Sequence, residues 1–332
     1  MTVPPSRALV DPHHRTVRDL RVSVTDRCNL RCSYCMPADG LAWLPRSEVL
    51  SFEEIERVAR VCVERFGFDG IRITGGEPTV RAHLPVLVGK LAALGVDLAM
   101  TTNGVLLESL APELRRAGLG RVNVSLDSLR PERFARLTRR DDLGRVLAGI
   151  DAAVAAGFSP VKVNCVVTRG VNDDEVVDLA AFARRRGVTM RFIEFMPLDA
   201  SGEWAAGAVV PLEEIVARVS TVFPLEAVAE PDSAPARRFR YRDGAGEIGV
   251  VASVTQSFCA TCDRVRLTAD GQFRHCLFAV RETDLRAVMR GGGSDDDVAA
   301  AIEAEVGRKW AGHRIGDVRF VRPARSMSQI GG

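Results

Sequence analysis

Short apolar runs alternate with stretches of helical periodicity from residue 20 to residue 195. The apolar runs predict strands at 20–24, 70–74, 98–101, 122–126, 161–167 and 190–195. The stretches between them predict helices at 52–66, 84–94, 106–117, 131–137, 143–156 and 173–186. Strands joined by helices of this length lie parallel, with right-handed crossovers. Six such units in series predict an α/β fold that contains a partial (β/α)6 barrel.

The regular alternation ends after residue 211 and divides the chain into three expected regions. Residues 1–18 have no periodicity, and we expect them to form a mobile N-terminal arm. The partial barrel should occupy 19–222, and a smaller C-terminal α+β region at 223–332 should close the barrel mouth. In parallel α/β folds, residues after the carboxyl ends of the strands carry the chemistry. The candidate site therefore lies just after the predicted strands.

The eight cysteines form two groups of three and two single residues. The first group is Cys28, Cys32 and Cys35, the second is Cys259, Cys262 and Cys276, and the single residues are Cys62 and Cys165. The sequence contains no leader-like apolar segment in its first 30 residues and no apolar run of the roughly 18 residues that a membrane span requires. We therefore expect a cytoplasmic protein, in which clustered cysteines bind metal or perform redox chemistry instead of pairing.

The first cysteine group follows the first predicted strand, so three thiolates on one loop can converge on one inorganic centre. A structural zinc site needs four protein ligands, and neither a histidine nor a fourth cysteine stands in this loop. An iron–sulfur cluster held by three cysteines keeps one iron open to an outside ligand. The alternative is that these are incidental loop thiols. The two single residues, Cys62 and Cys165, lie inside a predicted helix and strand, and we expect core thiols.

The pattern Cys28-x3-Cys32-x-Tyr34-Cys35 resembles that of the radical S-adenosylmethionine (SAM) enzymes. In that superfamily, three cysteines hold a [4Fe–4S] cluster whose open iron is chelated by SAM. The resemblance continues in the glycine-rich segment 74–78, where two glycines let the backbone approach a ligand closely. It implies that Cys28, Cys32 and Cys35 ligate a first [4Fe–4S] cluster and that SAM contacts Tyr34, Gly76, Ser125 and Met196.

The second cysteine group allows two interpretations. It could form a Cys3His zinc site with His275, but His275 and Cys276 are adjacent and would face opposite sides of an extended strand. The other interpretation, which we favour, is a second [4Fe–4S] cluster with an open iron. Arg264 and Arg266 share one face of a strand next to this group, which suits a polyanion such as a triphosphate. A solvated charged strand is the alternative.

With both cysteine groups considered, the chain resembles the GTP 3′,8-cyclase family over nearly its whole length. The matching stretches are 19–28, 71–78, 101–104, 123–127, 161–164, 193–196, 256–259 and the terminal Gly331-Gly332. That family performs the first step of molybdenum cofactor biosynthesis with a 5′-deoxyadenosyl radical. The resemblance implies that Cys259, Cys262 and Cys276 hold a second [4Fe–4S] cluster, that the Gly-Gly tail enters the active site, and that GTP contacts Arg21, Arg72, Thr101, Lys162, Arg264, Val265 and Arg266.

Some of these positions are informative without the resemblance. Lys162 lies inside an apolar strand, where its charge needs either a bound anion or a buried carboxylate. Arg21 and Arg72 interrupt apolar strands in the same way. Residues 244–249 fit the GxGxxG pattern, but a β-rich run follows them, so we expect a hairpin. No GxxxxGK[ST] sequence is present, and triphosphate binding would therefore depend on side chains.

Two other functions stay open on the sequence alone. One is a radical SAM enzyme that acts on a peptide or another nucleotide, and the other is a non-catalytic metal or redox sensor. For the first function, the expected partners are GTP, an electron donor and a downstream enzyme that forms cyclic pyranopterin. The formal net charge of +2 over 332 residues gives no indication of nucleic-acid polymer binding, and we expect a monomer or homodimer without membrane association.

Overall fold

The alternating apolar runs form six neighbouring parallel strands in the computed structural model, which describes residues 7–37, 39–199, 202, 204–229 and 233–331. The strands lie in chain order and each pairs with the next. They are β1 (Asp19–Ser23), β2 (Gly70–Thr74), β3 (Asp97–Thr102), β4 (Arg121–Ser125), β5 (Val161–Val167) and β6 (Thr189–Glu194). The predicted parallel core is thereby confirmed.

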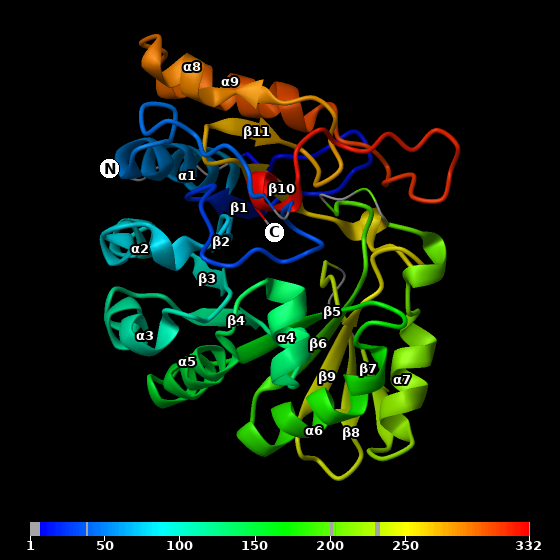
Figure 1. The fold of residues 1–332 in the computed structure, drawn as a ribbon. Helices are drawn as coiled ribbons and strands as arrows, with labels where there is room; N and C mark the ends of the chain where they lie inside the picture. Colours follow the sequence, from blue (N-terminus) through cyan, green and yellow to red (C-terminus); the bar gives the residue numbers. More distant parts are fainter. Residues whose placement is uncertain (1–6, 38, 200–201, 203, 230–232, 332) are drawn as a thin grey trace.

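Helices connect these strands and cover the outer face of the sheet (Figure 1). They are α1 (Phe52–Phe66), α2 (Leu84–Ala92), α3 (Leu107–Arg116), α4 (Pro131–Thr138), α5 (Leu143–Ala155) and α6 (Val176–Arg186). Ser51 begins α1 with a capping box, because its hydroxyl accepts from the Glu54 N–H while the Glu54 carboxylate accepts from the Ser51 N–H. The predicted helix at 173–186 begins with a 3-10 turn at Asp173–Glu175, so α6 starts three residues later than expected.

The two faces of the strands differ in chemistry, and this difference places the site. Residues that point outward, such as Leu20, Ile73 and Val163, are fully buried in the hydrophobic core beneath the helices. The alternate residues point inward, and Arg21 and Arg72 among them line a cavity. Polar side chains inside a sheet that is buried on its other face indicate a binding site.

The C-terminal region extends the same sheet at both edges. After α7 (Leu212–Ser220), the strands β7 (Leu225–Val228), β8 (Arg237–Tyr241) and β9 (Glu247–Val251) continue from β6, and β10 (Arg264–Leu267), β11 (Gln272–Arg274) and β12 (Thr283–Asp284) continue from β1. The sheet of the described residues is open, as a partial barrel requires. Helices α8 (Leu285–Arg290), α9 (Asp295–Val306) and α10 (Met327–Ile330) complete the chain.

A single segment, residues 252–263, connects the two C-terminal extensions of the sheet, one beside β6 and the other beside β1. It leaves β9 beside β6 and enters β10 beside β1, so it has to cross the open side of the barrel. Cys259 and Cys262 lie on this crossing segment, and Cys276 follows β11 at the edge that the segment reaches. The second cysteine group is thereby placed over the open side of the barrel.

The described part of the N-terminal segment, residues 7–18, packs against the rest of the protein. Leu9 and Val17 are buried in the core, and Val10 pairs with Thr16 in an isolated bridge. Arg15 is also buried and forms an ion pair with Asp11. The segment is packed because these apolar and paired side chains anchor it, whereas its sequence shows no periodicity. Residues 1–6 of the predicted arm lie outside the described residues.

Two smaller expectations are confirmed. Cys62 in α1 and Cys165 in β5 are fully buried. The GxGxxG stretch at 244–249 belongs to an antiparallel hairpin between β8 and β9, in which the Tyr241 N–H donates to the Gly246 carbonyl. Within the described part of the chain, none of the helices has both the length and the hydropathy that crossing a membrane requires.

Candidate functional site

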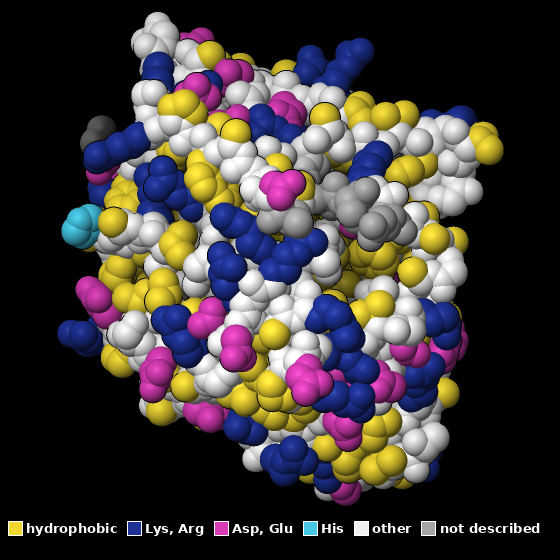
Figure 2. Space-filling view, viewed as in Figure 1, with side chains coloured by type: hydrophobic (Ala, Val, Ile, Leu, Met, Phe, Trp, Pro, Cys, Tyr) yellow, Lys and Arg dark blue, Asp and Glu magenta, His cyan; other side chains and the backbone are white. Residues whose placement is uncertain are grey.

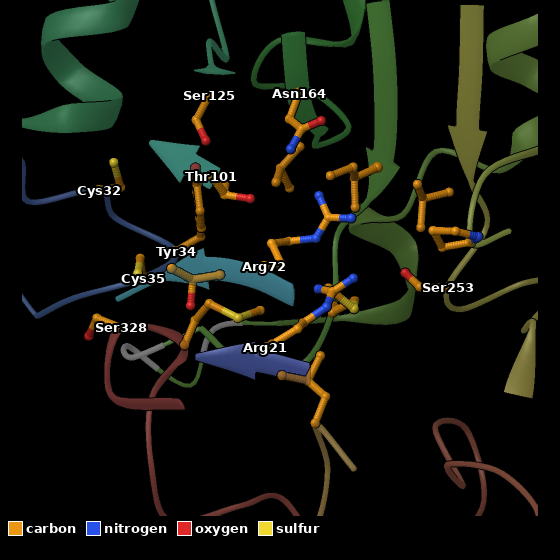
Figure 3. A pocket seen from close by; sticks show the side chains of 18 of the residues that line it. Arg21, Cys32, Tyr34, Cys35, Arg72, Thr101, Ser125, Asn164, Ser253 and Ser328 are labelled. Carbon is orange, nitrogen blue, oxygen red and sulfur yellow. The ribbon is translucent and has the colours of Figure 1, made fainter. Parts of the chain in front are cut away.

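A cavity of about 290 Å³ lies inside the open barrel, and both cysteine groups line it. Figure 3 shows Cys32, Cys35 and Ser328 at one end and Ser253 at the opposite end, with Arg21 and Arg72 between them. The two guanidinium groups point toward the Ser253 end. The cavity therefore joins the first cysteine loop to the segment that carries the second cysteine group.

The first cysteine loop is held by the neighbouring elements of the barrel. The Gly76 N–H donates to the Thr25 carbonyl and the Glu77 N–H donates to the Arg27 carbonyl, so the glycine-rich turn after β2 lies against the backbone before Cys28. On the other side, the Tyr34 hydroxyl donates to the Asp127 carboxylate over 2.7 Å. Burial raises the pKa of Asp127 to about 6. These contacts fix the loop from both sides.

Burial makes the first-group thiols weak acids. It raises the pKa of Cys28 to about 11 and that of Cys35 to about 12, and it also raises the pKa of Cys32. Metal ligation requires thiolates. A cationic centre that binds all three sulfurs would supply the charge that the surrounding protein lacks, because metal binding releases the thiol protons. The donor set therefore suits an iron–sulfur cluster.

The second group has a more cationic environment. Burial acts to raise the pKa of Cys259, but hydrogen bonding and charge from His313 outweigh it and lower this pKa to about 7. Burial is likewise outweighed at Cys262, whose pKa is lowered by Lys309 and Arg264. Burial raises the pKa of Cys276. This group is therefore also suited to binding a metal centre through thiolates.

The geometry does not favour the zinc interpretation of the second group. The His275 Nδ1 lies 2.6 Å from the Glu305 Oε1, and its ring packs against Trp310. His275 is absent from the cavity lining, whereas Cys276 is part of it. Among the side chains that the structure describes, no three Cys, His, Asp or Glu residues are close enough to share one metal ion. The three cysteines therefore face the cavity without His275, and a centre held by three cysteines fits the group better than a Cys3His site.

Three arginines stand side by side on neighbouring strands at the floor of the cavity. Arg21 of β1 is directly opposite Arg266 of β10 on one side and Arg72 of β2 on the other. Adjacent strands are about 4.8 Å apart, and like charges directly opposite repel. The Nε atoms of all three arginines are buried without a hydrogen-bond partner. A polyanion in the cavity would satisfy these donors and offset the repulsion.

Two further cations belong to this charged interior. Burial lowers the pKa of Arg191 to about 9, and the nearby Arg72 adds to the effect. Burial lowers the pKa of Lys162 to about 8. The charged group with the greatest effect on this pKa is Arg191, which is also a cation. Among the described residues, no carboxylate forms an ion pair with Lys162. Glu247 acts to raise the pKa of Lys162, but its carboxylate pairs with Arg238. The charge of Lys162 needs either a bound anion or a buried carboxylate, and the bound anion fits this environment better.

The C-terminal tail reaches the cavity from the side of the first cysteine group. Met327 and Ser328 of α10 line the cavity, and α10 lies near the centre of the molecule beside β1 and β10 (Figure 1). Gly331 has φ +88°, and a Cβ at this position would meet the Thr74 Oγ1 at 2.5 Å and the Ser23 Cβ at 3.1 Å. Only glycine fits there without displacement. Gly332 lies outside the described residues.

The cavity brings together most of the residues that the sequence analysis selects. All six grouped cysteines line it, together with Tyr34, Gly76, Ser125, Met196, Arg21, Arg72, Thr101, Arg264 and Arg266. Lys162 and Val265 are not part of the lining, and the Val265 side chain is fully buried in the core on the other face of β10. The individual roles of these residues stay predictions.

Several residues that line the cavity have no role among the sequence-based predictions. Asp127, Asn164, Arg191, Ser253 and His313 line it. Arg191 carries a detectable signal, because it interrupts an apolar strand as Arg21 and Arg72 do. Ser253 and His313 have no local signal, since they reach the cavity from irregular segments.

Comparison with protein families places two known domains on the chain. The Radical SAM superfamily matches residues 22–183, and the family described as Molybdenum Cofactor Synthesis C matches residues 188–315. The first match covers β1 to α6 and includes the first cysteine group. The second covers β6 to the segment after α9 and includes the second group.

Several relatives are similar over nearly the whole chain. A GTP 3′,8-cyclase of Mycobacterium sp. (strain KMS) is 49% identical over 333 residues, which cover 99% of this chain and 95% of the relative. The protein of the same name from Corynebacterium glutamicum (strain ATCC 13032) is 48% identical and is covered to 90%, with 98% of this chain aligned. That of Streptomyces coelicolor is 48% identical, with 98% and 97% covered.

Solved structures support the fold. The crystal structure of Streptococcus suis SuiB bound to S-adenosylmethionine is similar with a TM-score of 0.59 and 14% identity, and the similarity covers 88% of this chain and 69% of that chain. A second structure of SuiB gives a TM-score of 0.60 at 15% identity, with 80% and 62% covered. At such low identity the likeness is limited to the fold.

Proposed function

Because the chain belongs to the GTP 3′,8-cyclase family within the radical SAM superfamily, we propose that it converts GTP to (8S)-3′,8-cyclo-7,8-dihydroguanosine 5′-triphosphate. This reaction is the first step of molybdenum cofactor biosynthesis. Two [4Fe–4S] clusters and SAM are the cofactors that the family implies. The first cluster, when bound and reduced, would supply one electron for the cleavage of SAM to methionine and a 5′-deoxyadenosyl radical, and this radical would take a hydrogen atom from the ribose of GTP.

The residues at the first end of the cavity suit the radical-generating half of this reaction. Cys28, Cys32 and Cys35 would hold the first cluster. Tyr34, Gly76, Ser125 and Met196 line the same cavity and would contact SAM. The hydrogen bond between Tyr34 and Asp127 would keep the tyrosine ring in place.

The row of Arg266, Arg21 and Arg72, in which Asp19 near Arg21 is the one paired acid among the described residues, is the single observation that carries the substrate assignment. Three adjacent cations whose Nε atoms are buried favour a ligand with several negative charges, and a triphosphate has them. We assign Arg264, Thr101, Lys162 and the backbone around Val265 to the same ligand, and we add Arg191. Cys259, Cys262 and Cys276 would hold the second cluster, which would supply a binding position for the guanine.

This arrangement supports retention of the triphosphate during the reaction. No P-loop sequence is present, and the cations of the cavity come from strands instead of a glycine-rich loop before a helix. Side-chain cations that only bind and orient the phosphates provide no activated water for hydrolysis. The guanine and ribose are thereby held between the two cysteine groups while the phosphates stay bound.

Anaerobic reconstitution with iron and sulfide tests the proposal. We expect about eight irons per chain, as two [4Fe–4S] clusters require, and formation of 5′-deoxyadenosine that depends on GTP. Bound zinc without iron would refute the proposal in favour of a metal sensor. Full iron loading with SAM cleavage that responds to a peptide or another nucleotide, and not to GTP, would refute the substrate assignment alone. An electron donor and a pyranopterin-forming enzyme are the further partners that we propose.

A further inference from the structure

Lys309 is a buried cation directly behind the second cysteine group. It follows α9, and its side chain is 4% exposed. Its Nζ donates to the Arg264 carbonyl over 2.7 Å and to the His275 carbonyl over 2.8 Å. It also lies 3.8 Å from the Cys262 Sγ. An ammonium group has three N–H donors, and these three contacts use all of them.

The three acceptors connect Lys309 with two cysteines of the group. Arg264 is two residues after Cys262 and begins β10, while His275 directly precedes Cys276. One ammonium group therefore holds the backbone next to both of these cysteines. The Cys262 sulfur is the third acceptor, so the same cation also touches a proposed cluster ligand.

The charge of Lys309 has no acidic partner in the part of the chain that the structure describes. Glu305, four residues before Lys309, pairs instead with His275 and Arg308. The Lys309 Nζ lies 3.8 Å from the Cys262 Sγ, so its positive charge acts directly on the second cysteine group. A buried cation is stable only with a compensating negative charge. Thiolates that hold a metal centre would provide it.

We propose that Lys309 is a positioning residue of the second cluster, which holds the segments of Cys262 and Cys276 and stabilises the reduced form of the cluster. This inference rests on the proposed function, because it requires a cluster at the second group. Adding an electron makes a thiolate-bound cluster more negative, and a nearby cation or a hydrogen bond to sulfur favours that state. Removal of the ammonium group should therefore lower the reduction potential of this cluster.

Arg15 provides a matched control. It is also a buried cation, and it also donates to a backbone carbonyl of the second cysteine group. Its Nη1 donates to the Cys259 carbonyl over 2.5 Å and to the Ala311 carbonyl over 2.9 Å. Unlike Lys309, Arg15 has a carboxylate partner, Asp11. Its recorded hydrogen bonds go to carbonyl and carboxylate oxygens, so its loss should loosen the loop without removing a charge from the cluster sulfurs.

The experiment compares Lys309→Met, Lys309→Gln and Arg15→Leu in a background in which Cys28, Cys32 and Cys35 are replaced by alanine, so that only the second cluster is observed. After anaerobic reconstitution, iron is counted and the cluster is titrated with a reductant by electron paramagnetic resonance. In the Lys309 variants we expect about four irons and a roughly tenfold less favourable reduction equilibrium, which is ~59 mV for one electron. In Arg15→Leu the potential should not change.

Each outcome decides between the alternatives. An unchanged potential in an iron-loaded Lys309 variant, or an equal shift in Arg15→Leu, overturns the proposal. Loss of iron from both Lys309 variants but not from Arg15→Leu supports it, because the ammonium is then needed for assembly. Equal loss of iron from all three variants overturns it, since any buried cation of this region would then serve folding alone. Absence of iron from the unsubstituted second group would instead refute the proposed function.

Discussion

At the scale of single residues, two arginines of the site, Arg72 and Arg266, differ from the arginines of the outer surface because no acid pairs with them among the described residues. Arginines on the outer surface pair with acids, as Arg186 does with Asp151 and Arg184 with Asp243. Acidic and basic side chains are accordingly mixed over much of the face in Figure 2. Arg72 and Arg266 have no such pair among the described residues, although both lie in the interior. An unpaired buried arginine costs stability unless a ligand compensates it.

The first prediction at this scale concerns Arg266. Replacing it with alanine removes one cation of the row while the cysteines remain, so both clusters should assemble but GTP should bind about ten- to a hundredfold more weakly. Equilibrium binding of GTP and iron counting on the same preparation measure the two effects. Arg116→Ala is the control, because this exposed arginine donates only to a carbonyl of its own helix. GTP affinity equal to that of the unsubstituted protein would refute the role of Arg266.

The second prediction concerns the pH dependence of GTP binding. The pKa of Lys162 is lowered to about 8 by burial and by Arg191, so the free protein loses this charge as the pH rises through 8. An anion binds the protonated form, and GTP affinity should therefore fall by up to about tenfold per pH unit above pH 8 and be nearly constant below it.

Binding measured between pH 7 and pH 9 in the unsubstituted protein and in Lys162→Met separates this effect from titration of the nucleotide. The methionine variant should bind more weakly at pH 7 and lack the additional fall above pH 8. Parallel pH profiles of the two proteins would contradict the assignment. Below pH 9 the contribution of Arg191, whose pKa is about 9, stays small.

At the scale of secondary-structure elements, local signals explain which parts could be predicted. The bounds of α1 were predictable because an amphipathic stretch, a capping serine and a terminal glycine all lie within it or next to it. In contrast, β7 has four residues of mixed exposure and depends on its pairing with β8, which no local pattern encodes. Short edge strands of this kind are specified by tertiary contacts. The order of the C-terminal strands was unpredictable for the same reason.

The candidate site shows the same division between local and long-range signals. Arg21 and Arg72 were predictable because a charge inside an apolar strand is visible in the sequence. Lys309 and Arg15 were not, because their partners Arg264 and Cys259 are 45 and 244 residues away. Contacts over such separations follow from the fold and not from local composition. The sequence predicts a mobile arm at residues 1–18 because the contacts that hold its described part, such as those of Arg15, are also to residues far away in the sequence.

The prediction for an element concerns the glycine-rich turn after β2. A Cβ on Gly76 would lie 2.6 Å from the Asp26 carbonyl oxygen and would also collide with the Arg27 carbonyl, and both are backbone atoms that cannot move independently. Gly76→Ala should therefore displace the segment before Cys28. We expect loss of the first cluster and retention of the second, or about four irons per chain.

Iron counting and SAM binding check this outcome. Gly89→Ala in α2 is the matched control, because its Cβ would have 4.0 Å to the nearest atom, the Ala117 carbonyl oxygen. Full iron loading of Gly76→Ala would show that the loop can shift, and that the close approach of the turn is not what holds the first cysteine group.

At the scale of the whole molecule, the strands of the barrel form the site, and segments from the two end regions of the chain cover it. The segment that crosses from β9 to β10 carries Cys259, and α10 lines the cavity with Ser328. The N-terminal segment holds the covering segments in place, because Arg15 donates to the carbonyls of Cys259, Trp310 and Ala311. Three segments far apart in the sequence therefore meet at one guanidinium group over the open side of the barrel.

This convergence leads to a prediction for the stability of the molecule. Arg15→Leu leaves the buried Asp11 without its cation and removes three bonds to backbone carbonyls, so we expect a loss of about 3 kcal/mol in the free energy of unfolding. Arg18→Leu is the control, because the Arg18 side chain is 55% exposed and its nearest acidic atom is 4.0 Å away. Denaturant unfolding gives the free energies, and hydrogen exchange locates the loosened segment. Faster exchange should be confined to 252–263 and 310–313, since these are the segments that Arg15 joins; a uniform increase over the whole sheet would instead show that the N-terminal segment supports the core and not the covering segments.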